Sequence, residues 1–280
     1  MSARVITIAC RTPDRLLDGC RGATTLAGLL AEAIGAEPET VGTSSDPRVA
    51  PWSEDLDGAR DGLLSAAQHV EDAMNAGQAP VVLHGECSIA LSTLPVVARI
   101  RPDARILWLD AHGDFNTPDT TRSDYLGGMA LAGACGEWDP DLQLGFADPA
   151  RVVLAGGRDF DDAERELIDK EGVTVVEGRS IMGDDLIAVL GDDPVYVHLD
   201  LDVLEKDELP VLFPTADGLE IAELRELLGR VAQGREIVGF EVTNFQAPLD
   251  EFERTLGATA VKRVVEPLLD ALKEGAHVRN

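Results

Sequence analysis

The sequence has few basic side chains for its length. Its 280 residues include 24 Lys and Arg against 51 Asp and Glu, which gives a formal net charge of −27. A protein that binds nucleic acid needs clustered Lys and Arg side chains to neutralise phosphates, and no segment concentrates them. The same deficit disfavours binding to anionic membrane surfaces. We therefore expect neither a nucleic acid nor a membrane among the partners of this chain.

Long apolar segments and cysteine pairs are also missing. No uninterrupted apolar run reaches the length of about 18 residues that a membrane span requires. The first residues, MSARVITIAC, lead directly into a strand-like segment and not into the apolar stretch of a secretory signal. The four cysteines show no CxxC spacing. We expect reduced thiols in a cytoplasmic protein at Cys10, Cys20, Cys87 and Cys135.

Aromatic side chains make up only 4% of the residues, although 45% of the chain is hydrophobic. The core must therefore consist mainly of Val, Leu, Ile and Ala. Short strand-like apolar runs alternate along the chain with segments of helical periodicity, which is typical of a parallel sheet covered by helices on both faces. We expect one α/β domain over residues 1–280, with three layers (α/β/α) and a doubly wound, mainly parallel sheet.

The expected elements follow from these runs. Strands are predicted at 5–9, 81–84, 106–110, 152–155, 173–176, 195–200 and 236–242. Helices are predicted at 88–100, 161–170, 221–233 and 251–272, and apolar residues with helical spacing occur in 26–34 and 63–73. The stretch 36–57 is rich in Pro, Ser, Thr and acidic residues, and we expect it to form a surface loop.

Three of the predicted strands end in polar residues that can bind metal ions. Their sequences are VVLHGECS (81–88), ILWLDAHGDFN (106–116) and VYVHLDLDV (195–203). In open α/β sheets the ligand crevice lies at the carboxyl ends of the strands, so the three segments are expected to converge. The sequence thus places one candidate site at this edge of the sheet.

Acidic side chains alternate in two of these segments. Asp110, His112 and Asp114 follow one apolar run, and Asp200 and Asp202 end another. In extended backbone, alternate side chains share a face, which suits the binding of one metal centre. Taken singly, each residue has a simpler interpretation, such as a turn cap for Asp110 or a loop histidine for His112.

Four aspartates drawn together favour the metal interpretation. Two unit charges about 4 Å apart interact by about 4 kcal/mol at an effective dielectric constant near 20, so the carboxylates would repel one another strongly without cations. Oxygen ligands with one imidazole suit Mn²⁺ best among the common metals, and Fe²⁺, Co²⁺, Ni²⁺ and Zn²⁺ are alternatives.

These motifs resemble those of the arginase, or ureohydrolase, family of binuclear manganese amidinohydrolases. WLDAHGDFN and HLDLDVL match the family's D-A-H-x-D and D-x-D signatures, and HGECS stands in the place of its G-G-D-H-S motif. The order and spacing of the three motifs match over nearly the whole chain. Residues 87–136 are especially similar to the Nω-hydroxy-L-arginine amidinohydrolases of D-cycloserine biosynthesis, which also have Cys in the histidine position.

The resemblance implies an arginase-like fold and two metal ions per subunit. By this resemblance the ligands are Cys87, Asp110, His112, Asp114, Asp200 and Asp202. Asp110 and Asp200 would bridge the ions, Cys87 and Asp114 would complete one site, and the remaining two residues would complete the other. A hydroxide between the ions would be the nucleophile, oriented by Asp114 as a hydrogen-bond acceptor.

Cys87 departs from the family pattern, because most members have histidine there. Alone, this residue would be interpreted as a small buried hydrophobe. Its place before a predicted helix, where the dipole lowers a thiol pKa, keeps metal binding possible. A soft thiolate is a poor partner for hard Mn²⁺, so we expect unequal occupancy: this site binds metal weakly, holds a softer metal or stays empty.

Two further departures concern proton transfer and the substrate. Gly127 stands where the family has a proton-shuttling histidine, so the general acid must be another group or water. His84 is a nearby candidate by sequence, although we favour a structural role for this histidine at the end of a strand. Asn244 stands where the family has a guanidinium-binding glutamate, and neutral Asn cannot form that ion pair. Either the substrate is less cationic, as an N-hydroxyguanidine is, or Glu241 compensates, or the reaction differs. We favour a Glu241 side chain that points elsewhere.

Asn116 matches a family position that contacts the amino-acid end of the substrate, although an Asn in a loop after a strand is ordinary turn chemistry. Arg158 also follows an apolar strand, and we expect it to pair with Asp159 or Asp161. Family resemblance further suggests a homotrimer or homohexamer.

The resemblance implies hydrolysis of a C–N bond in a guanidino or N-hydroxyguanidino compound by a metal-bound hydroxide, releasing urea or hydroxyurea. An Nω-hydroxyarginine-like small molecule is the expected substrate. The alternatives are hydrolysis of another linear amidine or amide, and a catalytically weakened member that binds a metal or small molecule without turnover.

Overall fold

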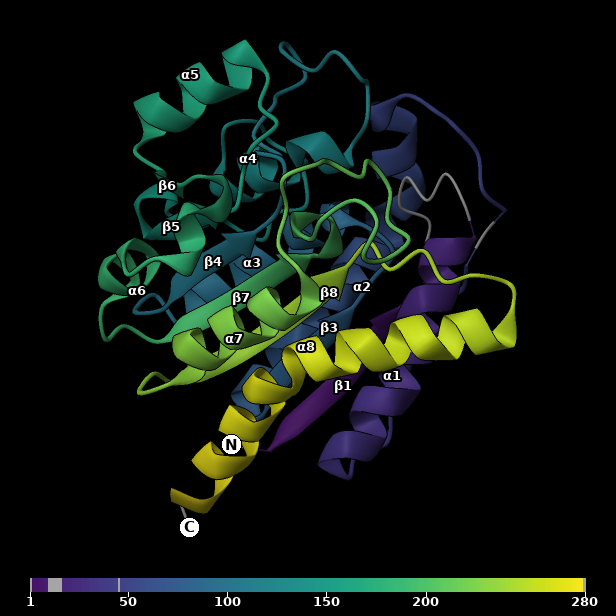
Figure 1. Cartoon of the computed structure of the whole chain (residues 1–280). Helices are drawn as coiled ribbons and strands as arrows, with labels where there is room; N and C mark the ends of the chain where they lie inside the picture. The colour runs from purple at the N-terminus through teal and green to yellow at the C-terminus, as the bar shows by residue number, and fades with distance from the viewer. Residues whose placement is uncertain (1, 10–16, 45, 279–280) are drawn as a thin grey trace.

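Eight parallel strands form a single sheet in the computed structural model, which describes residues 2–9, 17–44 and 46–278 (Figure 1). The strands are β1 (Ala3–Ile8), β2 (Glu39–Val41), β3 (Ala79–Leu83), β4 (Arg105–Leu109), β5 (Val152–Ala155), β6 (Thr174–Val176), β7 (Val195–Asp200) and β8 (Ile237–Thr243). Their order across the sheet is β2-β1-β3-β8-β7-β4-β5-β6. The predicted strands all occur, with ends that differ by one or two residues.

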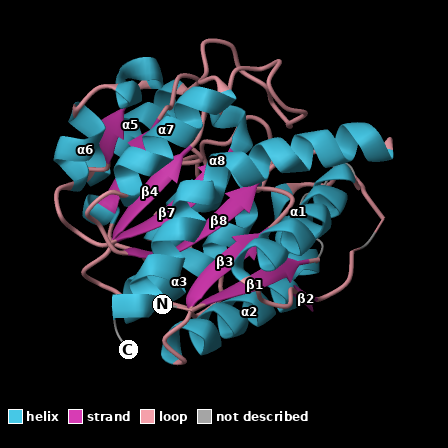
Figure 2. Ribbon diagram, turned by 60° about the horizontal axis from the view of Figure 1, so that its bottom comes forward, coloured by secondary structure: helices cyan, strands magenta, loops and turns pink. Residues whose placement is uncertain are grey.

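Helices cover both faces of this sheet, which confirms the three-layer α/β/α architecture (Figure 2). One layer contains α1 (Asp18–Ile34), α6 (Asp185–Leu190), α7 (Ile221–Ala232) and α8 (Glu251–Val278). The opposite layer contains α2 (Trp52–Asn75), α3 (Ala90–Ile100), α4 (Ala130–Cys135) and α5 (Asp162–Glu171). The predicted helices are present, and α1, α2 and α8 extend beyond the predicted ranges.

Each face of the sheet has its own core, because successive strand side chains point to opposite faces. On β4, Leu107 and Leu109 pack beneath the α1, α6, α7 and α8 layer, whereas Ile106 and Trp108 pack beneath the opposite layer. The interior is mostly aliphatic, as the scarcity of aromatic residues requires. Burial on both faces explains why the strands are nearly continuous apolar runs.

The expectation of a surface loop over 36–57 is wrong in part. Residues Glu39–Val41 form β2, which pairs with β1 at the sheet edge, and α2 begins at Trp52. A three-residue strand is too short for its pattern to be recognised. The start of α2 carried a usable signal, because Glu54 and Asp55 lie in its first turn and stabilise the positive end of the helix dipole.

The central strands β3, β8, β7 and β4 are neighbours, and the chain continues from their carboxyl ends into the polar motifs. Strand order reverses here, since β7 and β8 separate β3 from β4. Such a switch point is the usual position of a ligand site in an open α/β sheet. Residues far apart in the sequence therefore meet at one edge.

Two remaining expectations concern cysteines and membranes. Cys87 and Cys135 are buried and free of disulfides, whereas Cys10 lies outside the described residues. Within the described ranges, no helix combines the length and the apolar character needed to cross a membrane.

Candidate metal centre

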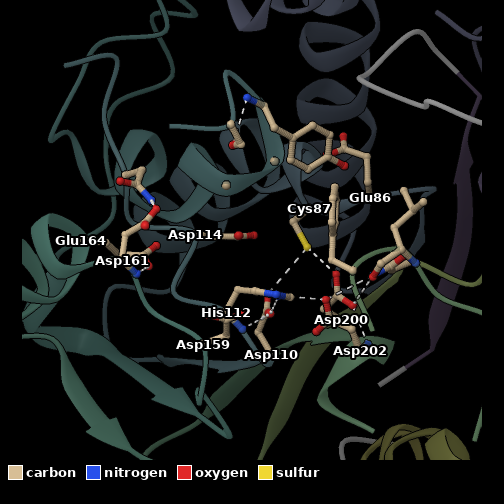
Figure 3. Close-up of a pocket in the computed structure, with 18 residues that line it drawn as sticks. Glu86, Cys87, Asp110, His112, Asp114, Asp159, Asp161, Glu164, Asp200 and Asp202 are labelled. Atoms are coloured by element: carbon tan, nitrogen blue, oxygen red, sulfur yellow. Dashed lines mark hydrogen bonds and ion pairs between the residues drawn. The ribbon is translucent and has the colours of Figure 1, made fainter. Parts of the chain in front are cut away.

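The sequence-predicted site residues gather around one cavity of about 290 Å³ at the carboxyl ends of the central strands (Figure 3). Its lining includes all six expected ligands and the two expected substrate contacts: Cys87, Asp110, His112, Asp114, Asp200, Asp202, Asn116 and Asn244. The four aspartates are all at most 8% exposed. Convergence of the three motifs, inferred from the ends of the strands, is therefore observed.

Asp110 follows β4 directly and makes the turn-cap hydrogen bond considered for it. Its Oδ1 accepts a hydrogen bond of 2.7 Å from the His112 backbone N–H, as a turn cap does. Its Oδ2 accepts a hydrogen bond of 3.1 Å from Nε1 of Trp108, and the residue lines the cavity. The His112 ring places Nδ1 3.4 Å from Oδ1 of Asp110 and 3.0 Å from Oδ2 of Asp202.

Asp200 and Asp202 are held by backbone and amide donors at the end of β7. Oδ1 of Asp200 accepts from the Asp202 backbone N–H at 2.7 Å and from Nδ2 of Asn244 at 2.8 Å. Oδ1 of Asp202 accepts from the Ala111 backbone N–H at 3.0 Å. Asn244 itself is fixed, since its Oδ1 accepts from the Leu212 backbone N–H. These bonds orient the carboxylates before any ligand binds.

Cys87 begins a short 3-10 helix (Cys87–Ile89) after β3, and its thiol faces the aspartates. Sγ lies 2.8 Å from Oδ2 of Asp200 and 3.9 Å from Oδ2 of Asp110. Burial, together with the charge of Asp200, raises the pKa of the thiol well above its usual value. The expected lowering of this pKa by a helix dipole is thus outweighed by burial and carboxylate charge, and a thiolate here requires a compensating cation.

Asp114 lines the cavity, but its backbone is not the extended strand that the alternating pattern predicts. β4 ends at Leu109, and Asp114 adopts a left-handed backbone conformation with φ of 49°. Its carbonyl oxygen accepts from the N–H groups of Leu131 and Ala132, which fix the turn. Burial, followed by the charge of Asp110, raises the pKa of its carboxyl well above the usual value.

The donor set fits divalent cations. The candidate ligand atoms of Asp110, His112 and Asp202 all lie within 4.8 Å of one another, and so do those of Cys87, Asp110 and His198. Burial opposes protonation of His112, but its bonds to Asp110 and Asp202 raise its pKa to about 12. Burial and the charges of Asp110 and Asp200 raise the pKa of Asp202 well above normal. The Asp202 carboxyl therefore favours its protonated form unless a cation binds beside it.

Asn116 lines the cavity beside acidic groups. Its Nδ2 donates to Oδ2 of Asp161 at 3.2 Å, and Asp161 and Glu164 line the cavity too. Glu164 accepts from the Phe115 backbone N–H at 2.8 Å, and burial raises its pKa to about 7. Sequence reasoning missed Glu164, whose position in the first turn of α5 is ordinary for a helix-capping residue.

His198 was missed as well, although it alternates with Asp200 along β7. The carboxylate of Glu241 on the neighbouring β8 contacts its ring, with 2.6 Å between Oε1 and Nδ1. The Glu241 side chain is therefore buried against His198 and Tyr196 and does not line the cavity, as favoured from the sequence. The sequence VYVHLDLDV did indicate a special role for His198, because a histidine is unusual on a strand that is buried on both faces.

Arg158 does not act as expected, because its guanidinium binds backbone carbonyls in place of Asp159 or Asp161. It donates to the carbonyl oxygens of Asp202 and Leu204 at 2.9 and 3.0 Å, and further bonds reach Gly156, Val203, Thr215 and Ala216. Five N–H groups in a rigid fork suit this task. Arg158 therefore holds together the loop that follows β7.

Replacing Arg158 with lysine should destabilise the protein by about 3 kcal/mol, because an ammonium cannot satisfy so many carbonyls at once. Urea denaturation would measure the loss. Arg225→Lys is the matched control, since Arg225 is exposed and its change should stay within about 0.5 kcal/mol. Equal stability of the two variants would show that the Arg158 network does not support the fold.

Comparisons with known proteins show which proteins this chain is similar to. The family model described as the arginase family matches residues 45–268. An N(omega)-hydroxy-L-arginine amidinohydrolase from Streptomyces lavendulae is 36% identical over 261 residues, covering 93% of this chain and 95% of that protein. An arginase from Bacillus caldovelox is 33% identical over 207 residues, covering 69% of each. The crystal structure of an arginase from Bacillus cereus superposes with a TM-score of 0.81 at 26% identity, covering 96% of this chain and 98% of that one.

Proposed function

This chain belongs to the arginase family, and we propose that it hydrolyses a C–N bond in an N-hydroxyguanidino compound such as Nω-hydroxy-L-arginine. It is a hydrolase of linear amidines by its family. The observation that carries the proposal is the convergence of Cys87, His112 and four buried aspartates on one small cavity. In the reaction, water would add to the guanidino carbon and the alkyl amine would leave. Hydroxyarginine would give ornithine and hydroxyurea.

Two metal ions would be held by the side chains at the cavity floor. Asp110, His112 and Asp202 form one group of ligand atoms, and Cys87 with Asp110 begins the other. We propose Asp200 as a further shared ligand and Asp114 as a ligand on the Cys87 side. Bound metal ions would supply a nucleophile from water at neutral pH and stabilise developing negative charge. Mn²⁺ suits the oxygen-rich group, and the Cys87 side favours a softer ion.

The charge of the cavity wall suits a substrate with cationic groups. Besides the four aspartates, Glu86, Asp159, Asp161 and Glu164 line it, and no Lys or Arg among the described residues does. At its mouth Tyr125 and Phe213 meet edge to face, with ring centroids 5.2 Å apart. An amino-acid substrate would place its aliphatic stem against these rings, and Asn116 would contact the amino-acid end.

Asn244 supports the choice of an N-hydroxyguanidine over a guanidinium. Its amide nitrogen is engaged with Asp200 and its amide oxygen with Leu212. It therefore orients metal-binding carboxylates and offers no negative charge to a substrate. An N-hydroxyguanidine is less basic than a guanidine, so binding it costs less where this ion pair is missing. Relative rates on the two substrates test this choice.

Glu86 is our candidate for the proton donor that Gly127 cannot supply. A Cβ atom on Gly127 would lie 2.8 Å from Oε2 of Glu86 and 2.5 Å from Cε1 of Tyr125, so these two side chains fill the space beside the glycine. Oε2 of Glu86 also lies 3.5 Å from the Tyr125 hydroxyl, which can donate to it. His84, considered from the sequence, is instead turned to the carbonyl of Glu86 and is absent from the cavity lining.

Glu86→Gln should lower kcat by about a hundredfold, since positioned acids and bases contribute about 10² to 10⁴ in rate. The amide keeps the shape and the cap on Ser88 but cannot donate a carboxyl proton. Steady-state kinetics across pH would show the loss of one limb of the profile. Glu253→Gln, which alters an exposed carboxyl on α8 outside the cavity, serves as control. An unchanged pH profile in Glu86→Gln would rule out this role.

The experiment that tests the function compares product release from arginine, Nω-hydroxyarginine and agmatine with added Mn²⁺. Hydroxyurea from hydroxyarginine is the expected main product. Turnover restricted to another substrate would favour hydrolysis of a different linear amidine or amide. Metal binding without any turnover would favour a catalytically weakened member of the family.

We further propose one arginase-like domain over residues 1–280, a cytoplasmic location, and a homotrimer or homohexamer.

A further inference from the structure

His198 does not line the cavity, but one of its ring nitrogens lies close to Cys87 and Asp110. Its side chain on β7 is fully buried, with Nε2 3.3 Å from Sγ of Cys87. One ring nitrogen of His198, Sγ of Cys87 and a carboxylate oxygen of Asp110 lie within 4.8 Å of one another. The six ligands predicted from the sequence do not include this histidine. Yet its position relative to Cys87 and Asp110 is that of a third donor around one ion.

The ring of His198 is held in a fixed orientation by Trp108. The two residues are register partners on β7 and β4, and their rings stack with centroids 3.5 Å apart and planes within 1°. Trp108 also donates its indole N–H to Oδ2 of Asp110 at 3.1 Å. The buried Trp108 side chain thus positions two candidate metal ligands, His198 and Asp110. Ligands held in this way by supporting residues are what a metal site needs.

The opposite ring nitrogen of His198 is bound by a buried carboxylate. Oε1 of Glu241 lies 2.6 Å from Nδ1, and Oε2 of Glu241 accepts a hydrogen bond of 3.0 Å from the Tyr196 hydroxyl. When Nδ1 donates its proton to Glu241, Nε2 carries a lone pair on the side of Cys87, whose Sγ is 3.3 Å away. Histidines that bind metals nearly always have such a carboxylate or carbonyl partner on the other nitrogen.

We propose that Nε2 of His198 is a metal ligand on the Cys87 side of the centre. This inference rests on the metal-dependent function proposed above. In a tetrahedral site with metal–sulfur and metal–nitrogen bonds of the usual length, sulfur and nitrogen are about 3.6 Å apart, close to the separation of Sγ and Nε2. The side chain of residue 198 would thereby supply the imidazole that the chain lacks at position 87.

The donor chemistry sets the metal preference of the two sides. A thiolate, an imidazole and a carboxylate are a combination that Zn²⁺ and Co²⁺ bind well, whereas Mn²⁺ prefers oxygen ligands. We therefore expect the Cys87 and His198 side to select Zn²⁺ or Co²⁺ over Mn²⁺. The competing role for His198 is that of a hydrogen-bond partner for Cys87 only, with no bond to the metal.

X-ray absorption of the Co²⁺-loaded full-length protein distinguishes these roles, because it detects imidazole bound to the metal. His112→Gln serves as the background, since it removes the expected imidazole of the other side. Imidazole nitrogen at about 2.0 to 2.1 Å should remain in this variant and disappear when His198→Gln is added. His69→Gln is the matched control, because His69 lies on α2 with its ring bound to the Ser65 carbonyl.

Metal affinity gives a second readout that does not depend on turnover. We expect His198→Gln to weaken Co²⁺ or Zn²⁺ binding on the Cys87 side by at least about a hundredfold, and Glu241→Gln to weaken it by about ten- to a hundredfold. The His112→Gln protein retains His198, so it decides the question even where His198→Gln fails to fold. Absence of metal-bound imidazole in His112→Gln would overturn the proposal.

Failure of this inference can be told apart from failure of the proposed function. Hydrolysis of hydroxyarginine without a metal bond to His198 would overturn the inference alone. A metal bond to His198 without hydrolysis of any amidine would support the inference and contradict the function.

Discussion

Asp110→Asn is expected to remove both metal ions from the protein and to abolish turnover. Asp110 is the only residue common to the two groups of candidate ligand atoms found among the described residues. Asparagine keeps the size and one acceptor oxygen but loses the negative charge. Because even residues that only support a ligand change metal affinity about ten- to a hundredfold, we expect a loss of at least about a thousandfold here. Metal analysis after dialysis would measure it.

Asp159→Asn is the control for this prediction. Asp159 lines the same cavity but belongs to neither ligand group, so the variant should keep its metal content. Both changes remove one negative charge from the cavity, which separates ligation from a general electrostatic effect. Two tightly held equivalents of metal in Asp110→Asn would contradict the assignment of Asp110 as the shared ligand.

Asp114→Asn is expected to lower kcat by about 10² to 10⁴ while the ion on the His112 side stays bound. Asp114 lies outside both compact ligand groups, and its carboxyl faces the same cavity. We propose that it accepts a proton from the attacking water and orients it. Asparagine tolerates the left-handed backbone that this position adopts, so the turn should be preserved. Single-turnover kinetics at saturating metal would measure the effect on chemistry.

Asp141→Asn is a matched control, since Asp141 has the same left-handed backbone with φ of 53° and lies on the exposed surface. It tests whether the exchange itself disturbs such a turn. Native kcat is expected in this control. If Asp114→Asn also turned over at the native rate, Asp114 would have no part in proton transfer.

Much of the fold could be predicted because burial on both faces makes each parallel strand an apolar run. The central strands and the convergence of their polar ends follow from this pattern and from the rule for ligand sites in open sheets. The edge strand β2 could not be predicted, since three residues carry too little periodicity. The polar composition of 36–57 indicates a loop, whereas the acidic first turn of α2 indicates the start of a helix.

Candidate ligands could be predicted where neighbouring residues in the sequence mark them. Contacts that depend on the pairing of strands could not be predicted. Asp110, His112, Asp200 and Asp202 could be found because each closes an apolar run. The environment of His198 depends on Trp108 and Glu241, which become its neighbours only when β4, β7 and β8 pair. The spacing of residues along the sequence does not reveal which residues of neighbouring strands lie side by side.

Arg158 and Asp114 show a second limit of sequence reasoning. Arg158 was expected to pair with a nearby acid, because an ion pair is the usual role of such a residue. Its real partners are backbone carbonyls of the loop after β7, and carbonyls are the same in every sequence. Alternation in an extended backbone predicts that Asp114 lies at the site. Asp114 does line the cavity, but its backbone is left-handed and not extended.

The most direct test of the account is product analysis with the metal-loaded protein. The purified chain, reconstituted with Mn²⁺ alone and with Mn²⁺ plus Zn²⁺ or Co²⁺, would be incubated with Nω-hydroxyarginine, arginine and agmatine in separate reactions. We predict hydroxyurea and ornithine in equal amounts from hydroxyarginine, at a higher rate than urea from arginine. Two bound metal ions with neither urea nor hydroxyurea from any of the three substrates would contradict the proposed function.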